Sequence, residues 1–398
     1  MFEPANRMSG LHTSVFTDLL RQKDLFEKET GLPVLDFSLG SPDIVPDESV
    51  VNALKEAVAD PRNYRYAVSA KAQLVTAIQT WYHERYQVDL EDDEILVLQG
   101  SQEALVNLPL IFCNPGDLVL VPDPYYPIYV DAPHLAGARI EYMPLLEKNG
   151  YMIDLDAIDP ETADKAKLMV VNYPNNPTGA IANQAWMEKL KDFACAHNIL
   201  VIYDNAYSDL VYNGHPAESY LSLPGAKETG VELNSFSKAY GMAGARLGVL
   251  VGNKSVLDAY RKLKSNLDYG IFLPIQEAGI AALKSGTGYI ENLRKEYIAR
   301  RNLMLASFKE AGWILPDCEA TMFFWAPIPD QYANSLLFAK DLLAQTGILV
   351  TPGTSFGQQG ERYVRIAMVQ SKEHILEAAR RLKDSHFFDQ DFLERCFR

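Results

Sequence analysis

Five short, uninterrupted apolar runs between residues 94 and 252 constrain the fold more than any other feature of the sequence. Their polarity does not alternate, which is typical of strands that are buried on both faces, as in a parallel sheet covered by helices. Segments with helical spacing separate them, such as the one that Asn183 can cap. We therefore expect an α/β fold, a three-layer α/β/α sandwich with a mostly parallel central sheet. The runs are Ile95–Leu98, Leu118–Val121, Leu168–Val171, Leu200–Tyr203 and Leu247–Val251.

The sequence changes character after about residue 290. A charged helix at Glu291–Ala311 leads to two short apolar segments, Met322–Ala326 and Tyr363–Val369, and then to a last helix from Glu373. This order predicts a smaller α+β unit. The first 45 residues or so, with a helix at Val15–Lys28, are too few to form a core of their own. We predict a large domain at 46–290 and a discontinuous small domain made of 1–45 and 291–398.

Charge and residue spacing exclude several classes of protein. The 398 residues include 37 Lys and Arg against 52 Asp and Glu, a formal net charge of −15, which argues against nucleic acid as a partner. The four cysteines and seven histidines lack the spacing of a zinc site or a disulfide framework, so we expect no metal and reduced, mostly buried thiols. No signal peptide and no run of ~18 apolar residues is seen, so we expect a cytoplasmic protein that does not contact a membrane.

The segment Ser235–Gly248 carries the strongest chemical signal. Lys238 lies between Ser237 and a glycine-rich stretch, and Arg246 follows. Serine hydroxyls and an arginine can hold a phosphate, because the guanidinium group binds oxyanions in bidentate fashion and glycines permit close approach of the backbone. A single lysine is far more often a surface residue, so this pattern alone leaves that alternative open.

Four further features can place polar groups near that lysine. Gly100–Ala104 joins a strand to a helix, where free backbone amides bind anions. Asp204 ends a buried strand, three residues before Tyr207, at the edge where open α/β sheets bind ligands. Tyr173–Gly179 follows another strand, and Arg365 interrupts an apolar run. Each of these has an ordinary structural alternative, namely a turn, a cap or an exposed edge residue.

Taken together, these motifs resemble the class I and II aminotransferases, which are pyridoxal-phosphate-dependent enzymes of fold type I. The resemblance covers nearly the whole chain, from Val15 to Arg365. The amino-acid sequence at Val119–Pro127 and Lys264–Asp268 is most similar to the branch of LL-diaminopimelate, aspartate and alanine aminotransferases. The resemblance implies pyridoxal 5'-phosphate as the cofactor and transfer of an amino group between an L-amino acid and a 2-oxo acid. It also implies ping-pong kinetics and a homodimer with composite active sites.

The resemblance assigns roles to individual residues. It makes Lys238 the catalytic residue, which binds the cofactor covalently and moves a proton, and makes Asp204 the partner that keeps the pyridine nitrogen protonated. Arg365 would grip the substrate carboxylate, with help from the backbone of Gly40 and from Asn176 and Asn266. The resemblance also implies that Tyr66 contacts the cofactor, and that Tyr66 and Asn266 both reach the site from the other subunit of a dimer. The other implied cofactor contacts are Ser101, Gln102, Tyr126, Asn176, Tyr207, Ser235, Ser237 and Arg246.

Two departures from the family pattern bear on the substrate and the interface. Gln102 stands where members of this branch often have a lysine that can meet a distal substrate carboxylate. This difference weakens the case for a dicarboxylic amino acid or diaminopimelate and leaves open a neutral side chain, such as that of alanine or an aromatic amino acid. No glycine follows Tyr66 where the family usually has one, so Tyr64 is an alternative cross-subunit residue.

Three rival functions are weighed against amino transfer. A pyridoxal-phosphate C–S lyase on the same fold shares Lys238, Asp204 and Arg365, so only its products distinguish it. A transcription regulator with an aminotransferase-like domain needs an additional basic domain, which the residues before the sheet cannot supply. A dinucleotide-dependent oxidoreductase fits worst, because no Gly-x-Gly-x-x-Gly motif opens a helix after the first strand. The amino donor, the keto acceptor and the pathway stay open.

Overall fold

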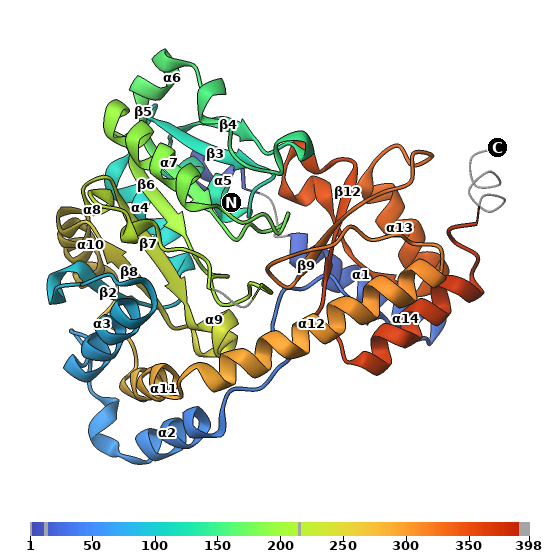
Figure 1. Cartoon of the computed structure of the whole chain (residues 1–398), viewed down its shortest axis with the longest axis horizontal. Coiled ribbons are helices and arrows are strands. Elements are labelled where there is room, and N and C mark those ends of the chain that lie inside the picture. The colour runs from blue at the N-terminus through green and yellow to red at the C-terminus, as the bar shows by residue number, and fades with distance from the viewer. Residues whose placement is uncertain (1, 12–14, 214–215, 390–398) are drawn as a thin grey trace.

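The computed structural model describes residues 2–11, 15–213 and 216–389, and a seven-stranded sheet forms the middle layer of its larger part, on the left in Figure 1. Neighbouring strands from β7 to β4 pair in parallel, whereas β8 runs antiparallel to both β7 and β2. The predicted, mostly parallel sheet is therefore confirmed. In spatial order the strands are β2 (Ile95–Leu98), β8 (Gly248–Gly252), β7 (Gly230–Ser235), β6 (Leu200–Asp204), β5 (Ala166–Asn172), β3 (Leu118–Asp123) and β4 (Arg139–Pro144).

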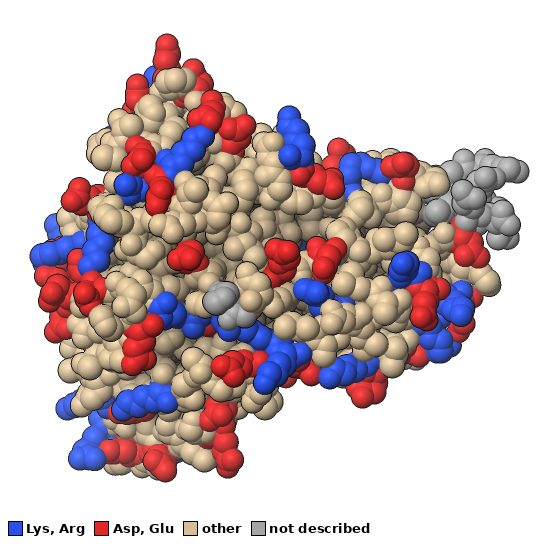
Figure 2. All heavy atoms as spheres, viewed as in Figure 1, with Lys and Arg blue, Asp and Glu red and all other residues tan. Residues whose placement is uncertain are grey.

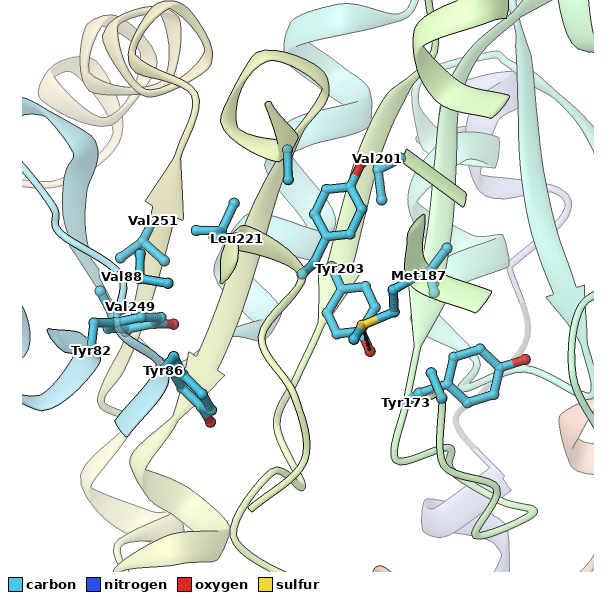
Figure 3. Close-up of a cluster of buried hydrophobic side chains, with 14 of the residues drawn as sticks. Tyr82, Tyr86, Val88, Tyr173, Met187, Val201, Tyr203, Leu221, Val249 and Val251 are labelled. Carbon is cyan, nitrogen blue, oxygen red and sulfur yellow. Dashed lines mark hydrogen bonds between the residues drawn. The ribbon is translucent and has the colours of Figure 1, made fainter. Parts of the chain in front are cut away.

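Helices cover both faces of this sheet, because alternate side chains of each strand enter two separate cores. Leu120 and Tyr203 belong to the core under α3 (Ala72–Tyr86), α7 (Gln184–His197) and α11 (Leu273–Lys284). Val119 and Ile202 belong to the core under α4 (Gln102–Phe112), α5 (Ile128–Leu135) and α10 (Lys254–Leu267). In the first core, Met187 lies against Tyr203, whose hydroxyl donates to its Sδ at 3.6 Å (Figure 3). The three-layer sandwich is thus confirmed.

Two strands of the sheet lie outside the five apolar runs of the sequence. β7 is buried throughout, yet Glu232 and Asn234 interrupt its apolar pattern. β4 is an edge strand, in which Met143 is buried while most other residues are exposed. A buried polar residue in the centre and a solvated edge both remove the continuous apolar signal, so neither strand could be recognised by that criterion.

A second, smaller unit packs beside the sheet. Its own sheet has the order β11 (Thr351–Pro352), β12 (Tyr363–Ala367) and β9 (Phe323–Pro327), and all pairs are antiparallel. The long helix α12 (Thr287–Glu310) runs from the large sheet to this unit (Figure 1) and begins a turn earlier than the sequence predicted. The remaining helices are α1 (Val15–Thr30), α2 (Glu48–Ala59), α6 (Pro160–Lys165), α8 (Ala226–Thr229), α9 (Phe236–Ala239), α13 (Ser335–Thr346) and α14 (Lys372–Asp384).

The N-terminal segment contacts both parts of the molecule. β1 (Leu35–Asp36) pairs in parallel with β10 (Ile348–Leu349), which places this stretch on the small unit. Gly10, by contrast, lies so close to α5 that a Cβ added to it would sit 2.3 Å from the ring of His134. The division of the chain into 1–45, 46–290 and 291–398 stays a prediction.

The surface carries both signs of charge, and acidic and basic side chains are interspersed on the face shown in Figure 2. Within the described residues, no helix is long and apolar enough to cross a membrane. The expectation of mostly buried thiols is wrong for Cys195, which is exposed, while Cys113 is half-buried and Cys318 buried. Cys396 lies outside the described residues.

Candidate active site

A cavity of about 300 Å³ lies at the carboxyl ends of β6 and β7, against the small unit, and it brings nearly all of the predicted site residues together. This is the edge at which open α/β sheets bind ligands. Of the predicted residues, only Tyr66 and Asn266 are missing from its lining. The lining includes Gly40, Ser101, Gln102, Tyr126, Asn176, Asp204, Tyr207, Ser235, Ser237, Lys238, Arg246 and Arg365, to which the structure adds Leu39, Ser41, Leu105, Tyr129, Ala206, Ala243 and Phe323.

Lys238 projects into this cavity from α9, the short helix that follows β7 directly. Ser235 caps the helix by accepting a hydrogen bond from the backbone N–H of Ser237 at 3.2 Å, which fixes where the lysine leaves the sheet. The Nζ of Lys238 donates to the carbonyl oxygen of Gly40 at 2.5 Å. Desolvation lowers the pKa of Lys238 to about 8, and Arg365 and Arg246 add to this effect. A neutral amine, the form that acts as nucleophile and general base, is therefore accessible near neutral pH.

Asp204 is a buried carboxylate at the last position of β6. The hydroxyl of Tyr129 donates to its Oδ2 at 2.7 Å, and the backbone N–H of Ala206 donates to its Oδ1 at 3.3 Å. Burial raises the pKa of Asp204 to about 6, against the opposing effect of these two hydrogen bonds. A cationic ligand atom beside this carboxylate would favour the charged form of both groups.

Tyr129 is a site residue that the sequence motifs did not reveal. It follows Tyr126 by three residues at the start of α5, and both tyrosines line the cavity. Their rings meet edge to face at a centroid distance of 5.8 Å, and the hydroxyl of Tyr126 donates to Oε1 of Gln102 at 3.3 Å. Tyr126 precedes α5, and the backbone N–H of Tyr129 donates to its carbonyl oxygen at 2.9 Å, so the turn that opens the helix brings the two rings together. The Tyr-x-x-Tyr spacing was therefore the signal that could have identified Tyr129.

Arg246 and the loop that follows β2 form a corner of the cavity that carries one positive charge. Gly100 has a φ of +78°, which other residues rarely adopt, and a Cβ added to it would lie 2.4 Å from Nη2 of Arg246 and would displace the guanidinium. The backbone of Gly100 and Ser101 leads directly into α4, where free amides favour an anion. Ser101, Ser235 and Ser237 line the same cavity, so hydroxyl donors and one cation converge here.

Arg365 enters the cavity from β12 of the small unit. It is 1% exposed, and its Nη1 and Nη2 donate to Oδ1 of Asn176 at 3.0 Å and to the carbonyl oxygen of Ser38 at 2.8 Å. The rings of Phe323 and Phe356 lie 4.2 and 4.7 Å from its Cζ. Burial lowers the pKa of Arg365 to about 10, so the group stays charged at neutral pH. Both of these acceptors are neutral oxygens, and a ligand carboxylate would bring the opposite charge to the guanidinium group.

Tyr66 and Asn266 lie on the surface, away from the cavity of their own chain. Tyr66 is 79% exposed and contacts the ring of Tyr269 at a centroid distance of 5.0 Å. Asn266 is exposed, and its Nδ2 donates to the carbonyl oxygen of Lys262 at 2.8 Å. Their predicted contribution to a second subunit's site stays a prediction.

Comparison with known proteins identifies the family. The model of the family "Aminotransferase class I and II" matches residues 33–382. The chain belongs to this family. This aminotransferase is 40% identical to the LL-diaminopimelate aminotransferase of Halothermothrix orenii over 385 residues, 96% of this chain and 98% of the relative.

Two solved structures have the same fold as this aminotransferase. The substrate-bound BacF structure from Bacillus subtilis matches with a TM-score of 0.93 and 35% identity, over 96% of this chain and 98% of that one. A probable N-succinyldiaminopimelate aminotransferase from Thermus thermophilus matches with a TM-score of 0.87 and 36% identity, over 94% and 100%. Fold type I and the resemblance to the LL-diaminopimelate branch are confirmed. The named activity of the curated relatives supports amino transfer and gives no support to the C–S lyase.

The enzyme is thus a pyridoxal-phosphate-dependent aminotransferase, and its cavity fits that cofactor. The corner at Gly100 and Arg246 can take a phosphate, Asp204 can pair with a pyridinium nitrogen, and the amine of Lys238 can bind a carbonyl carbon. When bound, the cofactor supplies an electron sink and carries the amino group between two half-reactions.

Replacing Asp204 by asparagine is expected to remove a pH dependence of stability from the cofactor-free protein. The folded pKa of about 6 exceeds the ordinary value of 3.8, so the stabilisation from Asp204 is fully present below pH 3.8 and is lost as the pH rises through 6. The free energy of unfolding of the wild type should fall by about 3 kcal/mol over this range relative to Asp204→Asn. Urea unfolding of both cofactor-free proteins between pH 4 and 7 measures this difference.

The comparison has an internal control. Glu232 is also buried, with a pKa raised to about 7 by burial, but it titrates in both proteins and cancels in the difference. An asparagine Oδ1 can accept from Tyr129 but not at the same time from the backbone N–H of Ala206, and the loss of that second bond does not depend on pH, so it does not alter the pH slope. If the free energy of unfolding changed equally with pH in the two proteins, the raised pKa of Asp204 in the cofactor-free protein would be wrong.

Proposed function

We propose that this aminotransferase moves the amino group of an L-amino acid with an uncharged side chain to a 2-oxo acid by a ping-pong mechanism. The observation that carries the proposal is the convergence of Lys238, Asp204 and Arg365, from three different elements, on one cavity. Each supplies a different requirement of the reaction: a base, an anion for the ring nitrogen and a cation for the α-carboxylate.

The residues of the cavity are assigned four roles: holding the phosphate, contacting the ring, binding the α-carboxylate and moving the proton. Ser101, Gln102, Ser235, Ser237 and Arg246 hold the phosphate, and Tyr126 covers the face of the ring. Tyr207 and Asn176 donate to the ring's phenolic oxygen, and Tyr129 orients Asp204 through its 2.7 Å hydrogen bond. Arg365, with Asn176 and the backbone of Gly40, binds the α-carboxylate. Lys238 would bind the cofactor through its Nζ and, as a neutral amine, would take a proton from the substrate Cα.

The proposed substrate class follows from the charges of the cavity. Its described lining contains three cations, Lys238, Arg246 and Arg365. Each already has a proposed partner: Lys238 the carbonyl carbon of the cofactor, Arg246 the phosphate, and Arg365 the α-carboxylate. A second substrate carboxylate would therefore meet Gln102 and tyrosines rather than a further cation within the described lining. The relative from Halothermothrix orenii is named for LL-diaminopimelate, which carries a second carboxylate and a second ammonium group. We infer that this chain prefers neutral side chains such as those of alanine or phenylalanine.

Single half-reactions test this proposal. One amino acid at a time is added to the cofactor-loaded enzyme without an acceptor, and the change in cofactor absorbance gives a rate constant. Alanine or phenylalanine is expected to react at least about tenfold faster than glutamate, aspartate and LL-diaminopimelate, because a desolvated carboxylate without a partner costs more than about 1.4 kcal/mol. Faster reaction of LL-diaminopimelate or glutamate would contradict the assigned substrate class while leaving amino transfer intact.

We further propose that the enzyme is a homodimer in which each chain completes the other's site with Tyr66 and Asn266. Support comes from a surface patch of exposed large apolar side chains around Tyr66, since such patches mark interfaces. A mass of twice 44.5 kDa in sedimentation equilibrium is expected, and a monomer would contradict the proposal. A cytoplasmic location stays a prediction. The patch consists of Tyr64, Tyr66, Tyr269 and Phe272, whose rings pair as Tyr64 with Phe272 at a centroid distance of 5.4 Å and Tyr66 with Tyr269 at 5.0 Å.

A further inference from the structure

A loop of the small unit is fastened to the large sheet next to the substrate-binding arginine. This loop, residues 353–360, contains the 3₁₀ turns Gly353–Phe356 and Gln358–Gly360 and connects β11 to β12, the strand that carries Arg365. The backbone N–H of Tyr125 donates to the carbonyl oxygen of Phe356 at 2.7 Å. In the opposite direction, the backbone N–H of Gln359 donates to Oδ1 of Asp123 at 3.2 Å.

Asp123 is held firmly enough to act as the fixed end of this connection. It is the last residue of β3 and is 5% exposed, and its own carbonyl oxygen accepts from the backbone N–H of Leu145 at 2.7 Å. Burial raises the pKa of Asp123, and the backbone N–H groups of Gln359 and Gln358 oppose that rise. The carboxyl group thus belongs to the large sheet, while its hydrogen-bond donors belong to the small unit.

The loop fits closely around the Asp123 carboxyl group. Gly357 has a φ of +115°, and a Cβ added to it would lie 2.1 Å from Oδ1 of Asp123. Only glycine permits both that backbone conformation and that approach. The neighbouring residue, Phe356, is fully buried, and its ring meets Trp325 edge to face at a centroid distance of 5.8 Å.

Phe356 connects this junction to the substrate site. Its ring centroid lies 4.7 Å from Cζ of Arg365, on which Phe323 also packs at 4.2 Å. Flat contacts with aromatic rings restrict the orientation of a guanidinium group, and a bidentate ion pair with a carboxylate requires a particular plane. Any shift of residues 356–359 therefore changes the surface against which Arg365 is oriented.

We propose that Asp123 is a positioning residue for the substrate carboxylate: it holds residues 357–359 and thereby keeps Phe356 packed on Arg365. This inference rests on the proposed role of Arg365 as the carboxylate-binding group. Asp123 does not line the cavity and touches neither cofactor nor substrate. Its effect is expected on the affinity for carboxylates rather than on the chemical steps at Lys238.

Three variants separate positioning from a general structural role. Asp123→Ala removes the acceptor, whereas Asp123→Asn keeps an Oδ1 that can accept from Gln359. Asp117→Ala is the matched control, because Asp117 precedes the same strand at its other end and also accepts from a backbone N–H, that of Asn114 at 2.8 Å. Thermal unfolding of the three holoenzymes shows whether each is folded.

Two measurements are made on each holoenzyme. Steady-state kinetics use the amino acid that the wild type converts fastest. A titration with acetate, a monocarboxylate without an amino group, is monitored by the absorbance of the cofactor and gives a Kd. Asp123→Ala should raise both the KM for the amino acid and the Kd for acetate about tenfold, as expected for loss of one hydrogen bond. Its kcat should change less than threefold or so, and its cofactor absorbance should stay unchanged. Asp123→Asn should restore both constants to within about twofold of the wild type, and Asp117→Ala should leave them unchanged.

An unchanged Kd for acetate in Asp123→Ala would overturn the inference. So would a fall in kcat and in cofactor affinity as large as the rise in KM. Failure of the proposed function has a different signature: the wild type would bind acetate but would not release a 2-oxo acid from any amino acid. In that case the acetate titration of the variants still decides whether Asp123 positions Arg365.

Discussion

Alanine in place of Lys238 is expected to abolish amino transfer, with a loss of roughly 10⁴-fold or more, because in the proposed mechanism this one side chain supplies both the covalent link and the general base. Within the described lining, Lys238 is the cavity's only lysine, and Arg246 and Arg365 cannot replace it, since a guanidinium group does not deprotonate near neutral pH. The rate of 2-oxo acid formation in a single turnover measures the loss.

Two further variants make the Lys238 result specific. Lys238→Arg keeps the positive charge but not a titratable amine, so it should be as inactive as the alanine variant. Lys254→Ala is the control: Lys254 is an exposed lysine that pairs with Asp93 and Asp258 and does not line the cavity, and its loss should leave the rate within about twofold. If Lys238→Ala kept more than about 1% of the wild-type rate, another residue would have to be the base.

Alanine in place of Arg365 is expected to lower kcat/KM for amino acids by about 10²–10⁴-fold. A hydrogen bond to a charged group contributes about 1.5–3 kcal/mol, and a bidentate pair contributes two. The cofactor absorbance should persist, because the phosphate is assigned to Arg246 and the serines of the other end of the cavity. Arg365→Lys should recover only part of the loss, since an ammonium group cannot reach Asn176, Ser38 and a carboxylate in one plane.

A substrate without a carboxylate distinguishes this role from damage to the fold. Ethylamine is alanine without its α-carboxylate, so its slow reaction with the cofactor should be nearly the same in wild type and Arg365→Ala. The ratio of the alanine and ethylamine rates therefore isolates the carboxylate contact, as in a double-mutant cycle. Equal losses for the two amines would show that Arg365 acts on the cavity as a whole and not on the carboxylate.

Strand ends located part of this candidate site from the sequence. Asp204 ends one of the recognised apolar runs and Ser101 follows another within a few residues, and the carboxyl ends of such strands meet at one edge of the sheet. Lys238 follows β7, which was not recognised, so it was found from its own serine- and glycine-rich motif. The same argument predicted the fold, although β4 and β7 escaped it, since an exposed edge and Glu232 break the continuity of the apolar signal.

What sequence could not predict depends on packing between distant segments. Phe323 and Phe356 look like ordinary core residues, and only the arrangement of the small sheet places their rings on Arg365. Asp123 was noticed as part of a motif, but its hydrogen bond to Gln359 joins residues 236 positions apart. Contacts of this kind follow from tertiary structure and leave no local periodicity behind.

The central claim is that amino groups are transferred at Lys238 in two separate half-reactions, and one measurement tests it most directly. The cofactor-loaded enzyme is mixed with alanine or phenylalanine in the absence of any acceptor, and 2-oxo acid and ammonia are both quantified. The account predicts one 2-oxo acid per subunit, no free ammonia, and renewed turnover only when a second 2-oxo acid is added. Continuous release of ammonia without an acceptor, or no 2-oxo acid from any amino acid, would contradict it.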